Sequence, residues 1–233
     1  MSNFGNHLCG GTLATSFTLS CNTTFAQLGL DLGDRLAQTS EIFGFATGGP
    51  SLDLAPAPAL SLGPIPGTFR HTQPLFARDA IGQAEVLATP FQMALVAEAV
   101  ATGGTIVQPH LLDRVENADT TVARTAPVDA WRRVMQPATA ADLTGLMRSV
   151  VERGTGTAAQ IPGVAVAGKT GTAQTRKGQA PHAWFIGFAP ADAPQYAIAV
   201  LIEHGGDLGN EATGGRVAAP VARAVLSRLL TGH

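Results

Sequence analysis

The chain has 233 residues, of which 45% are hydrophobic and 14% are charged, and its formal net charge is -2. This composition is typical of a folded domain and argues against a disordered chain. The nearly balanced charge offers no basic field to nucleic acid or to an anionic membrane surface, so we expect no nucleic-acid partner.

Targeting signals are absent from the sequence as it stands. No apolar run approaches the roughly 20 residues that span a bilayer, and the opening stretch MSNFGNHLCGG does not have the pattern of a signal peptide. If the parent protein is exported, we expect its targeting or anchoring segment to lie outside this chain.

The two cysteines, Cys9 and Cys21, are too few for a disulfide framework and have no partners at zinc-ligand spacing. The sequence leaves a bridge between them open but favours buried free thiols, a common state of isolated cysteines. The histidines are scattered without metal-ligand spacing. We therefore expect no metal and no other cofactor.

The first part of the chain predicts a small helical layer. Thr12 is suited to cap a short helix that residues 20–22 interrupt. Apolar residues at helical spacing predict a second helix over 23–32, and a third begins at Asp34 after the terminating Gly33. Residues 46–74 then turn rich in proline, which fixes φ and removes backbone donors, so we expect a long irregular segment there.

The middle of the chain predicts further helices. Thr89 before Pro90 is a helix opening, and the helix that follows is apolar on nearly every face, so we expect it to be buried, with Glu98 its only charge. Residues 105–112 are expected to be extended and 113–130 to be a polar connection without pattern. Residues 137–153 predict an amphipathic helix.

The last third predicts consecutive strands in VAVAGKTGTAQ, HAWFIGFAP and QYAIAVLIEHG, which favours an antiparallel meander. Residues 197–202 are apolar without alternation, as in a strand covered on both faces. A final helix is expected within 213–230, with Pro220 in its first turn. Helices before and after an antiparallel sheet indicate an α+β fold.

Two short motifs carry chemistry only in combination. Ser20 and Asn22 form an SxN triplet at a helix junction, which by itself is most often a structural helix boundary. Lys169-Thr170-Gly171-Thr172 stands on a predicted strand and places hydroxyls beside a glycine that allows close backbone approach. Alone, this motif is as compatible with a surface turn as with a binding site.

Their order and surroundings resemble the transpeptidase domain of class B penicillin-binding proteins, especially the actinobacterial type. The motif set is the one recognised for penicillin-binding proteins and β-lactamases. The similar stretches are NFGNHLCGGT, SCNTTFAQLGLDLG, IGQAEVLATPFQMALVAEAVATGG, IPGVAVAGKTGTAQ and HAWFIGFAP, so the resemblance spans nearly all of the chain. It implies a partial transpeptidase domain over 1–233, with a mainly helical part over 1–160 and a β part with the terminal helix over 161–233.

The resemblance implies catalytic roles for Ser20, Asn22 and Lys169. In the family, the serine of an SxxK motif attacks the acyl donor, and the acyl-enzyme passes to an amine acceptor. Ser20 would relay protons toward the attacking oxygen and the leaving amine, and Asn22 would hold the amide of the substrate. Lys169 would supply positive potential to the same proton network.

Substrate binding is implied for the rest of the strand motif. The hydroxyls of Thr170 and Thr172 would bind a carboxylate of the donor peptide or of a β-lactam, and Gly171 would leave room for that ligand. The backbone N–H of Thr172 would be one half of an oxyanion hole.

The sequence departs from the family at the nucleophile. Its lysines are Lys169 and Lys177, and neither has a serine three residues before it, so no SxxK motif is present. Because that motif precedes SxN in the family, we expect an N-terminal truncation inside the domain. The strand at 197–202 would then be an exposed apolar edge, and the isolated chain should be poorly stable.

We therefore expect a peptidoglycan D,D-transpeptidase of the cell envelope, acting at the outer face of the plasma membrane, whose supplied part lacks the nucleophile. Its partners would be the stem peptide, β-lactams, the missing N-terminal segment and division or cell-wall synthesis proteins. The alternative is a non-catalytic fragment that acts as a binding module. A serine β-lactamase ranks lower, because no deacylating water with its base is indicated.

Overall fold

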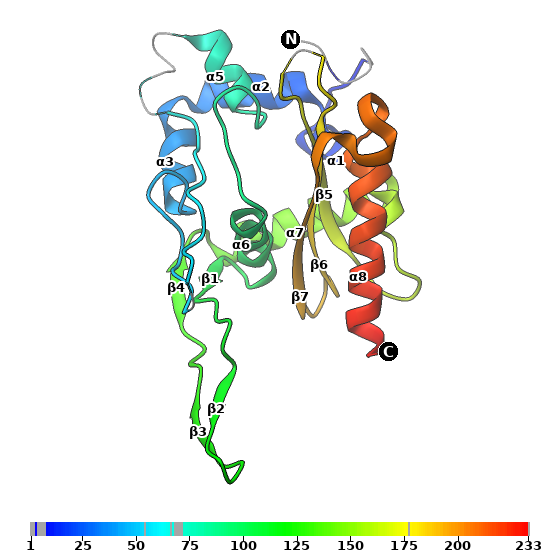
Figure 1. Ribbon diagram of the computed structural model, residues 1–233. Coiled ribbons are helices and arrows are strands. Elements are labelled where there is room, and N and C mark those ends of the chain that lie inside the picture. Colours follow the sequence, from blue (N-terminus) through cyan, green and yellow to red (C-terminus); the bar gives the residue numbers. More distant parts are fainter. Residues whose placement is uncertain are drawn as a thin grey trace.

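The computed structural model describes residues 3, 8–53, 55–65, 67, 72–176 and 178–232. It is an α+β structure in which helices flank a small antiparallel sheet, as the sequence predicts (Figure 1). Within the proline-rich segment 46–74, residues 54, 66 and 68–71 fall outside the described ranges, so the prediction of an irregular segment cannot be followed there.

The described helices largely follow the predicted positions. The α-helices are α1 Leu13–Leu19, α2 Asn22–Leu32, α3 Asp34–Ile42, α5 Gln73–Asp79, α6 Pro90–Ala101, α7 Pro137–Arg153 and α8 Ala219–Thr231. Short helical turns are η2 Thr157–Ala159, η3 Glu203–Glu211 and η4 Gly214–Ala218. Two predicted caps are confirmed, because the side chains of Thr12 and Thr89 accept hydrogen bonds from the N–H groups of Thr15 and Gln92.

The strands in the described part of the chain form three small antiparallel sheets. They are β1 Thr105–Val107, β2 Arg114–Glu116, β3 Val122–Thr125, β4 Ala130–Arg133, β5 Ala167–Ala173, β6 His182–Ala189 and β7 Tyr196–Ile202. The main sheet has the order β5-β6-β7, which confirms the predicted meander. Its register pairs Thr170 with Phe185 and Thr172 with Ala183, so β5 presents one long edge that β6 does not cover.

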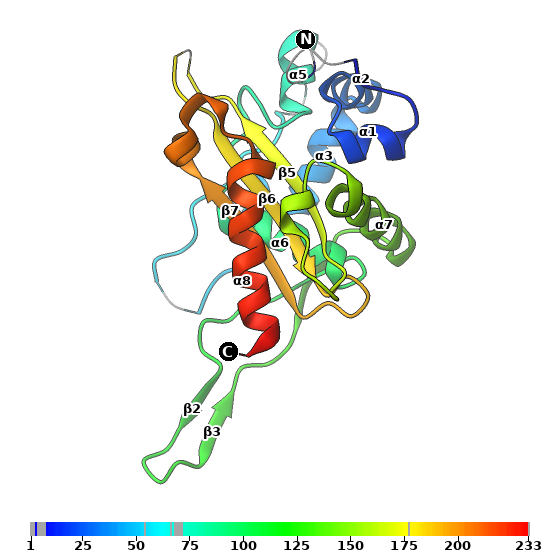
Figure 2. The same ribbon diagram turned by 90° about the vertical axis from the view of Figure 1, so that its right-hand side faces the viewer.

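The two faces of the main sheet carry different helices. Figure 2 shows α8 crossing in front of the strands, with α6 behind them and α7 alongside β5. Phe185 packs with Leu226 of α8, whereas Phe188 packs with Val100 of α6 and Met147 of α7. Because successive side chains of a strand point to opposite faces, the odd and even positions of β6 serve two separate core clusters.

Two connections differ from expectation. Residues 113–130 hold the β2–β3 hairpin, which projects from the body of the molecule (Figure 1). Its strand residues are all exposed, so its sequence lacks the alternation of buried and exposed residues by which a strand is predicted. Asp119 stabilises the turn of the hairpin, because its Oδ1 accepts a hydrogen bond from the N–H of Thr121. The helix α5 includes Pro74, whose missing N–H costs nothing in a first turn.

The strand β7 is less covered than its sequence indicates. Within residues 197–202 only Val200 is buried, and Ala197 is exposed. The prediction that both faces are covered is therefore wrong for this chain. In the part of the chain that the structure describes, β7 pairs with β6 alone and forms the second edge of the sheet.

Candidate active site

Ser20 stands at the end of α1 in an unusual backbone conformation. Its φ of 58° and ψ of 52° lie in the left-handed region, and the N–H of Cys21 donates to the carbonyl of Ser16 at 2.9 Å. This geometry closes a helix and turns the chain sharply, but it is costly for a residue with a Cβ. The turn leads directly into α2, whose first residue is the half-buried Asn22.

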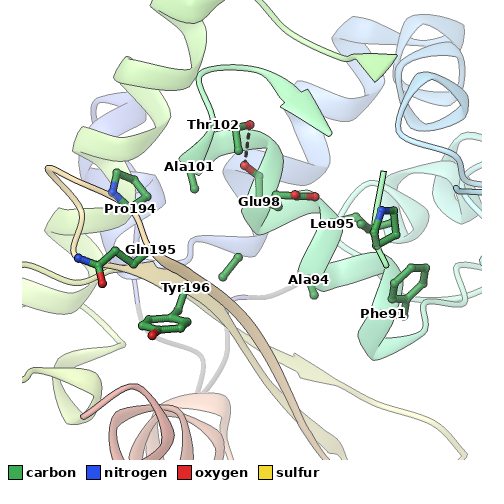
Figure 3. Close-up of a pocket in the computed structure, with 11 residues that line it drawn as sticks. Phe91, Ala94, Leu95, Glu98, Ala101, Thr102, Pro194, Gln195 and Tyr196 are labelled. Atoms are coloured by element: carbon green, nitrogen blue, oxygen red, sulfur yellow. Dashed lines mark hydrogen bonds between the residues drawn. The ribbon is translucent and has the colours of Figure 1, made fainter. Parts of the chain in front are cut away.

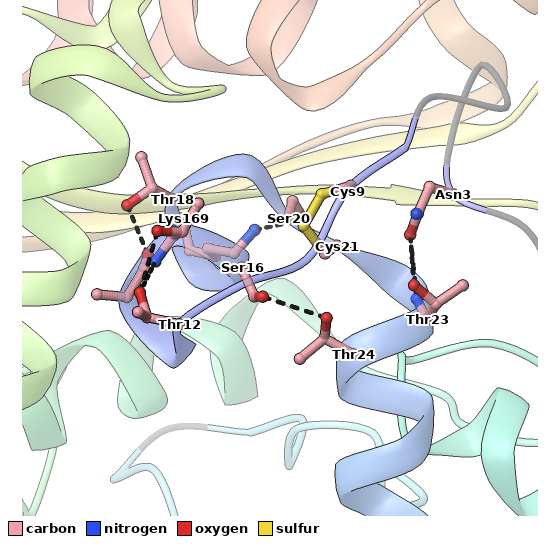
Figure 4. Close-up of a disulfide and its surroundings, with 12 residues drawn as sticks. Asn3, Cys9, Thr12, Ser16, Thr18, Ser20, Cys21, Thr23, Thr24 and Lys169 are labelled. Atoms are coloured by element: carbon pink, nitrogen blue, oxygen red, sulfur yellow. Dashed lines mark hydrogen bonds between the residues drawn. A yellow bond between two sulfur atoms is a disulfide. The ribbon is translucent and has the colours of Figure 1, made fainter.

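A disulfide joins Cys9 to Cys21, with 5.6 Å between their Cα atoms. The favoured alternative, free thiols, is therefore wrong and the bridge that the sequence left open is formed, because folding brings the segment before α1 against the junction of α1 and α2. Cys21 is fully buried and is the middle residue of the SxN triplet. The bridge thus anchors the triplet from its centre (Figure 4).

Lys169 lies on β5 and points at Ser20. Its Nζ donates to the Oγ of Ser20 at 2.7 Å and to the carbonyl oxygen of Thr170 at 3.0 Å, and Figure 4 shows the ammonium directed at the serine. The Nζ also lies 5.7 Å from the ring centroid of Phe17. Burial lowers the pKa of Lys169 from 10.5 to about 8, because desolvation disfavours the charged ammonium.

The contact between Ser20 and Lys169 depends on how α1 docks against α7. The hydroxyls of Thr18 and Ser149 are hydrogen bonded at 2.5 Å in a buried position. At Gly154 a Cβ would lie 2.4 Å from the carbonyl oxygen of Thr18, so only glycine allows this approach. The N–H of Thr155 donates to that same oxygen at 3.4 Å. The end of α7 therefore sets the position of α1.

Thr155 also fixes the strand motif. Its Oγ1 is hydrogen bonded to the Oγ1 of Thr170 at 2.5 Å, and the Oγ1 of Thr172 accepts from the N–H of Gly214 at 3.4 Å. Thr155 was not predicted to have a role, since the run Gly154-Thr155-Gly156 indicates only the end of a helix. One residue thus links α1, α7 and β5.

The space beside Gly171 is occupied by protein. A Cβ at this position would lie 3.2 Å from the Cβ of Trp184 on the neighbouring strand. The backbone of Gly171 is also in close contact with Gly214, where a Cβ would lie 2.6 Å from the Gly171 carbonyl oxygen. These contacts give the glycines a packing role. The expectation that Gly171 leaves room for a ligand stays a prediction, and this face of the strand is filled by Trp184.

The structure brings together some of the predicted site residues. Ser20 and Lys169 are in direct contact, and Thr170 and Thr172 follow on the same strand. No hydrogen bond between described residues joins the carboxamide of Asn22 to this pair. Asn22 lies two positions from Ser20 as the first residue of α2, and its role in a site with Ser20 and Lys169 stays a prediction.

A concave region lies between α6 and β7 (Figure 3). It is a cavity of about 490 Å³ whose lining is mostly apolar and includes Phe91, Ala94, Leu95 and Ala197. Among the described residues of the lining, Glu98 is the one that carries a charge. Burial raises the pKa of its carboxyl to about 7, although a hydrogen bond from the backbone of Val107 acts in the opposite direction.

Neither a metal site nor a membrane-spanning helix is found among the described residues. No group of three or more His, Cys, Asp or Glu side chains is gathered there as metal ligands. No described helix has both the length and the apolar character needed to cross a membrane.

Known proteins are similar over almost all of this chain. A family model described as the penicillin binding protein transpeptidase domain matches residues 2–227. The peptidoglycan D,D-transpeptidase PbpA of Mycolicibacterium smegmatis is 38% identical over 99% of this chain and 47% of that protein. PbpA of Mycobacterium tuberculosis is 38% identical over 100% of this chain and 48% of its own length. The chain thus spans about half the length of these curated relatives.

Solved structures agree with the sequence comparisons. Penicillin-binding protein A from M. tuberculosis, as a ceftriaxone acyl-enzyme complex, superposes with a TM-score of 0.84 at 37% identity, covering 97% of this chain and 51% of that one. The D,D-transpeptidase domain of a peptidoglycan glycosyltransferase from Eggerthella lenta gives a TM-score of 0.85 at 33% identity, covering 100% and 57%. With the α+β fold and the contact between the SxN and KTG motifs already established, this chain belongs to the family of penicillin-binding protein transpeptidase domains.

Proposed function

We propose that the chain is the C-terminal part of a D,D-transpeptidase that cross-links peptidoglycan stem peptides through an acyl-serine intermediate. The observation that carries this proposal is the 2.7 Å hydrogen bond from Lys169 to Ser20 at the edge of β5. It places a cation, a hydroxyl and an uncovered strand edge in one corner, and acyl transfer uses such groups beside its nucleophilic serine. The PbpA relatives carry this activity in their names.

The direction of the hydrogen bond suggests how Ser20 would relay a proton. Since the ammonium of Lys169 donates to the Oγ of Ser20, the hydroxyl hydrogen of Ser20 is free to point away from the lysine. That hydrogen would be donated to the leaving amine of the acyl donor, and Lys169 would replace it. A lysine pKa of about 8 suits this exchange, because the proton is held only weakly near neutral pH.

Hydroxyl groups on β5 would hold a carboxylate. Thr155 and Thr170 together have two hydroxyl hydrogens, and their mutual hydrogen bond uses one, so the other remains for a ligand. The hydroxyl of Thr172 accepts from Gly214 and likewise keeps its own hydrogen. We assign these donors to the carboxylate of the stem peptide or of a β-lactam. The Thr172 N–H would contribute to the oxyanion hole.

The nucleophile would come from an upstream segment of the same protein. The chain has no SxxK motif and spans about half the length of its PbpA relatives. We assign that segment to the partly exposed strand β7 and to the apolar cavity beside α6, because strand pairing and burial of this surface would both stabilise it. Asn22, which no described contact fixes, would complete the cleft by holding the substrate amide.

The relatives support a proposal for the setting of this activity. Solved structures of M. tuberculosis penicillin-binding protein A are acyl-enzyme complexes with ceftriaxone, imipenem and penicillin G. We propose that the completed protein is acylated by β-lactams in the same way. It would act in the cell envelope at the outer face of the plasma membrane, where stem peptides and cell-wall synthesis or division proteins are its partners.

Labelling with a fluorescent penicillin tests the proposal. The chain alone should form no covalent adduct, and the chain joined to its upstream half should be labelled at the SxxK serine. Mutation of that serine to alanine should abolish the label. A joined, cooperatively folded protein that takes up no penicillin would instead support the second candidate, a non-catalytic binding module, which the absence of SxxK from this chain favours.

A further inference from the structure

The side chain of Gln83 contacts the strand that carries the KTGT motif. Its Nε2 donates to the carbonyl oxygen of Thr172 at 3.2 Å, and its Oε1 accepts from the N–H of Gln174 at 3.3 Å. Gln83 lies between α5 and α6, 89 positions before Thr172 in the chain. A single carboxamide therefore occupies one acceptor and one donor on the uncovered edge of β5.

The contact reports which way the backbone of Thr172 faces. In an antiparallel pair, the N–H and C=O of one residue point to the same side, and this side alternates along the strand. Because the Thr172 carbonyl meets Gln83, the Thr172 N–H also points away from β6. Two further hydrogen bonds agree with this alternation, because they also use outward-facing groups at every second residue. The Thr170 carbonyl accepts from Lys169, and the Gln174 N–H donates to Gln83. Thr172 therefore carries the proposed oxyanion donor, its N–H, and its carbonyl oxygen is hydrogen bonded to Gln83.

The turn that presents Gln83 is tightly built. Asp79 is 3% exposed, and its Oδ1 accepts from the N–H of Glu85 at 3.0 Å across the turn. The N–H of Gln83 donates to the carbonyl of Arg78 at 3.0 Å. Ala84 follows with a φ of 57°, a left-handed conformation that a residue with a Cβ rarely adopts. Such strain persists only where surrounding contacts impose it.

The same turn is attached to the helix that carries the SxN triplet. A Cβ added at Gly29 of α2 would lie 2.2 Å from the Cβ of Ala80, so the two helices meet in direct contact there. Asn22 opens α2. The helical layer therefore meets β5 at two places, through Ser20 at Lys169 and through Gln83 at Thr172 and Gln174. The strand is held on both sides of the proposed oxyanion donor.

We propose that Gln83 is a positioning residue for acyl transfer: its carboxamide closes the edge of β5 after Thr172 and holds the Thr172 N–H at the orientation that an oxyanion needs. This inference rests on the proposed function. It also makes the Thr172 N–H the last outward donor on this edge that a ligand can reach, because the Gln174 N–H is already taken.

Two variants separate the contacts of Gln83. Gln83→Met keeps the length of the side chain and loses both hydrogen bonds, and Gln83→Glu keeps an acceptor for the Gln174 N–H but has no donor for the Thr172 carbonyl. Gln108→Met is the matched control, because Gln108 is also half buried and also donates to a backbone carbonyl, that of Ser51 at 2.5 Å.

The first measurement is amide hydrogen exchange in the chain joined to its upstream half. Exchange at Gln174 should be faster by on the order of tenfold in Gln83→Met, as expected for one lost hydrogen bond, and should stay close to the parent in Gln83→Glu and Gln108→Met. Unchanged exchange in Gln83→Met would show that the contact is not made in solution and would overturn the proposal.

The second measurement is acylation by fluorescent penicillin in the chain joined to its upstream half, resolved into a dissociation constant and a first-order acylation constant. Both Gln83 variants should lower the acylation constant by about 10- to 100-fold, the scale of a misplaced reacting group, with the dissociation constant changed by less than about threefold. Gln108→Met should match the parent. If Gln83→Met does not fold cooperatively in urea, Gln83→Glu alone decides the result.

The outcomes distinguish this inference from the function on which it rests. If the unsubstituted joined protein is not labelled, the proposed function fails and the positioning role fails with it. If that protein is labelled and the Gln83 variants keep its acylation constant, or lose only affinity, the positioning role alone is refuted.

Discussion

Ser20 allows backbone strain and proton relay to be tested separately. Its φ of 58° and ψ of 52° cost a residue with a Cβ roughly 1–2 kcal/mol, a cost that glycine avoids. Ser20→Gly would remove this strain, and Ser20→Ala would keep it. Both would remove the Oγ that accepts from Lys169 at 2.7 Å. The two variants therefore differ in backbone energy and share the same loss of chemistry.

The magnitudes predict an order of stability. A hydrogen bond to a charged group contributes about 1.5–3 kcal/mol, and both variants lose it while Lys169 keeps the Thr170 carbonyl. Relief of strain in Ser20→Gly is partly offset by about 0.4–1 kcal/mol of added chain entropy in the unfolded state. We expect the parent to be most stable and Ser20→Gly to exceed Ser20→Ala by about 1 kcal/mol.

Urea unfolding of the chain joined to its upstream half measures the stability difference, and equal m-values would show that both variants unfold from comparable states. In the joined protein, both should lose acylation by penicillin equally, by about 10²- to 10⁴-fold, because each lacks the proton relay. A Ser20→Ala variant as stable as Ser20→Gly would refute the strain argument. Full acylation in Ser20→Gly would refute the relay.

Three further predictions concern charge and covalent linkage. The pKa of Lys169 is lowered to about 8, so its contribution to stability should be lost as pH falls from 10.5 through 8, and urea titrations of the parent should show this slope while Lys169→Met does not. The pKa of Glu98 is raised to about 7, so the parent should lose stability as pH rises from 4.5 through 7, and Glu98→Gln should be flat over that range. A slope of the other sign in either titration would contradict the burial argument. Reduction of the Cys9–Cys21 disulfide, which spans 12 positions, should lower stability by about 3 kcal/mol in the chain-entropy estimate, and a melting temperature unchanged by reductant would contradict its structural role.

Sequence patterns predicted the structural features that depend on interactions between neighbouring residues. The caps at Thr12 and Thr89 act within one helical turn, and both are found as predicted. The meander over β5, β6 and β7 follows from short apolar runs separated by turn residues. The exposed hairpin over 113–130 was not predicted, because its strands have no buried face and therefore no alternation of apolar and polar residues.

The candidate site divides in a similar way. Its main residues were expected from a resemblance in motif order, and the structure places Ser20 and Lys169, which lie 149 positions apart, in direct contact. Thr155 and Gln83 were not assigned roles, since a threonine between glycines and a glutamine in a turn are unremarkable in isolation. Their importance comes from contacts with Thr170 and Thr172 across the fold.

The amino-acid sequence by itself determined most of the helices, the three strands of the main sheet and the family to which the chain belongs, because caps, periodicity and motif order are encoded over a few neighbouring residues. Only the tertiary structure decided that Cys9 is bonded to Cys21, that α1 docks through Gly154, and that Gln83 holds the edge of β5. Such contacts join distant segments, and whether they form depends on how whole helices pack against the sheet, which no short stretch of sequence specifies.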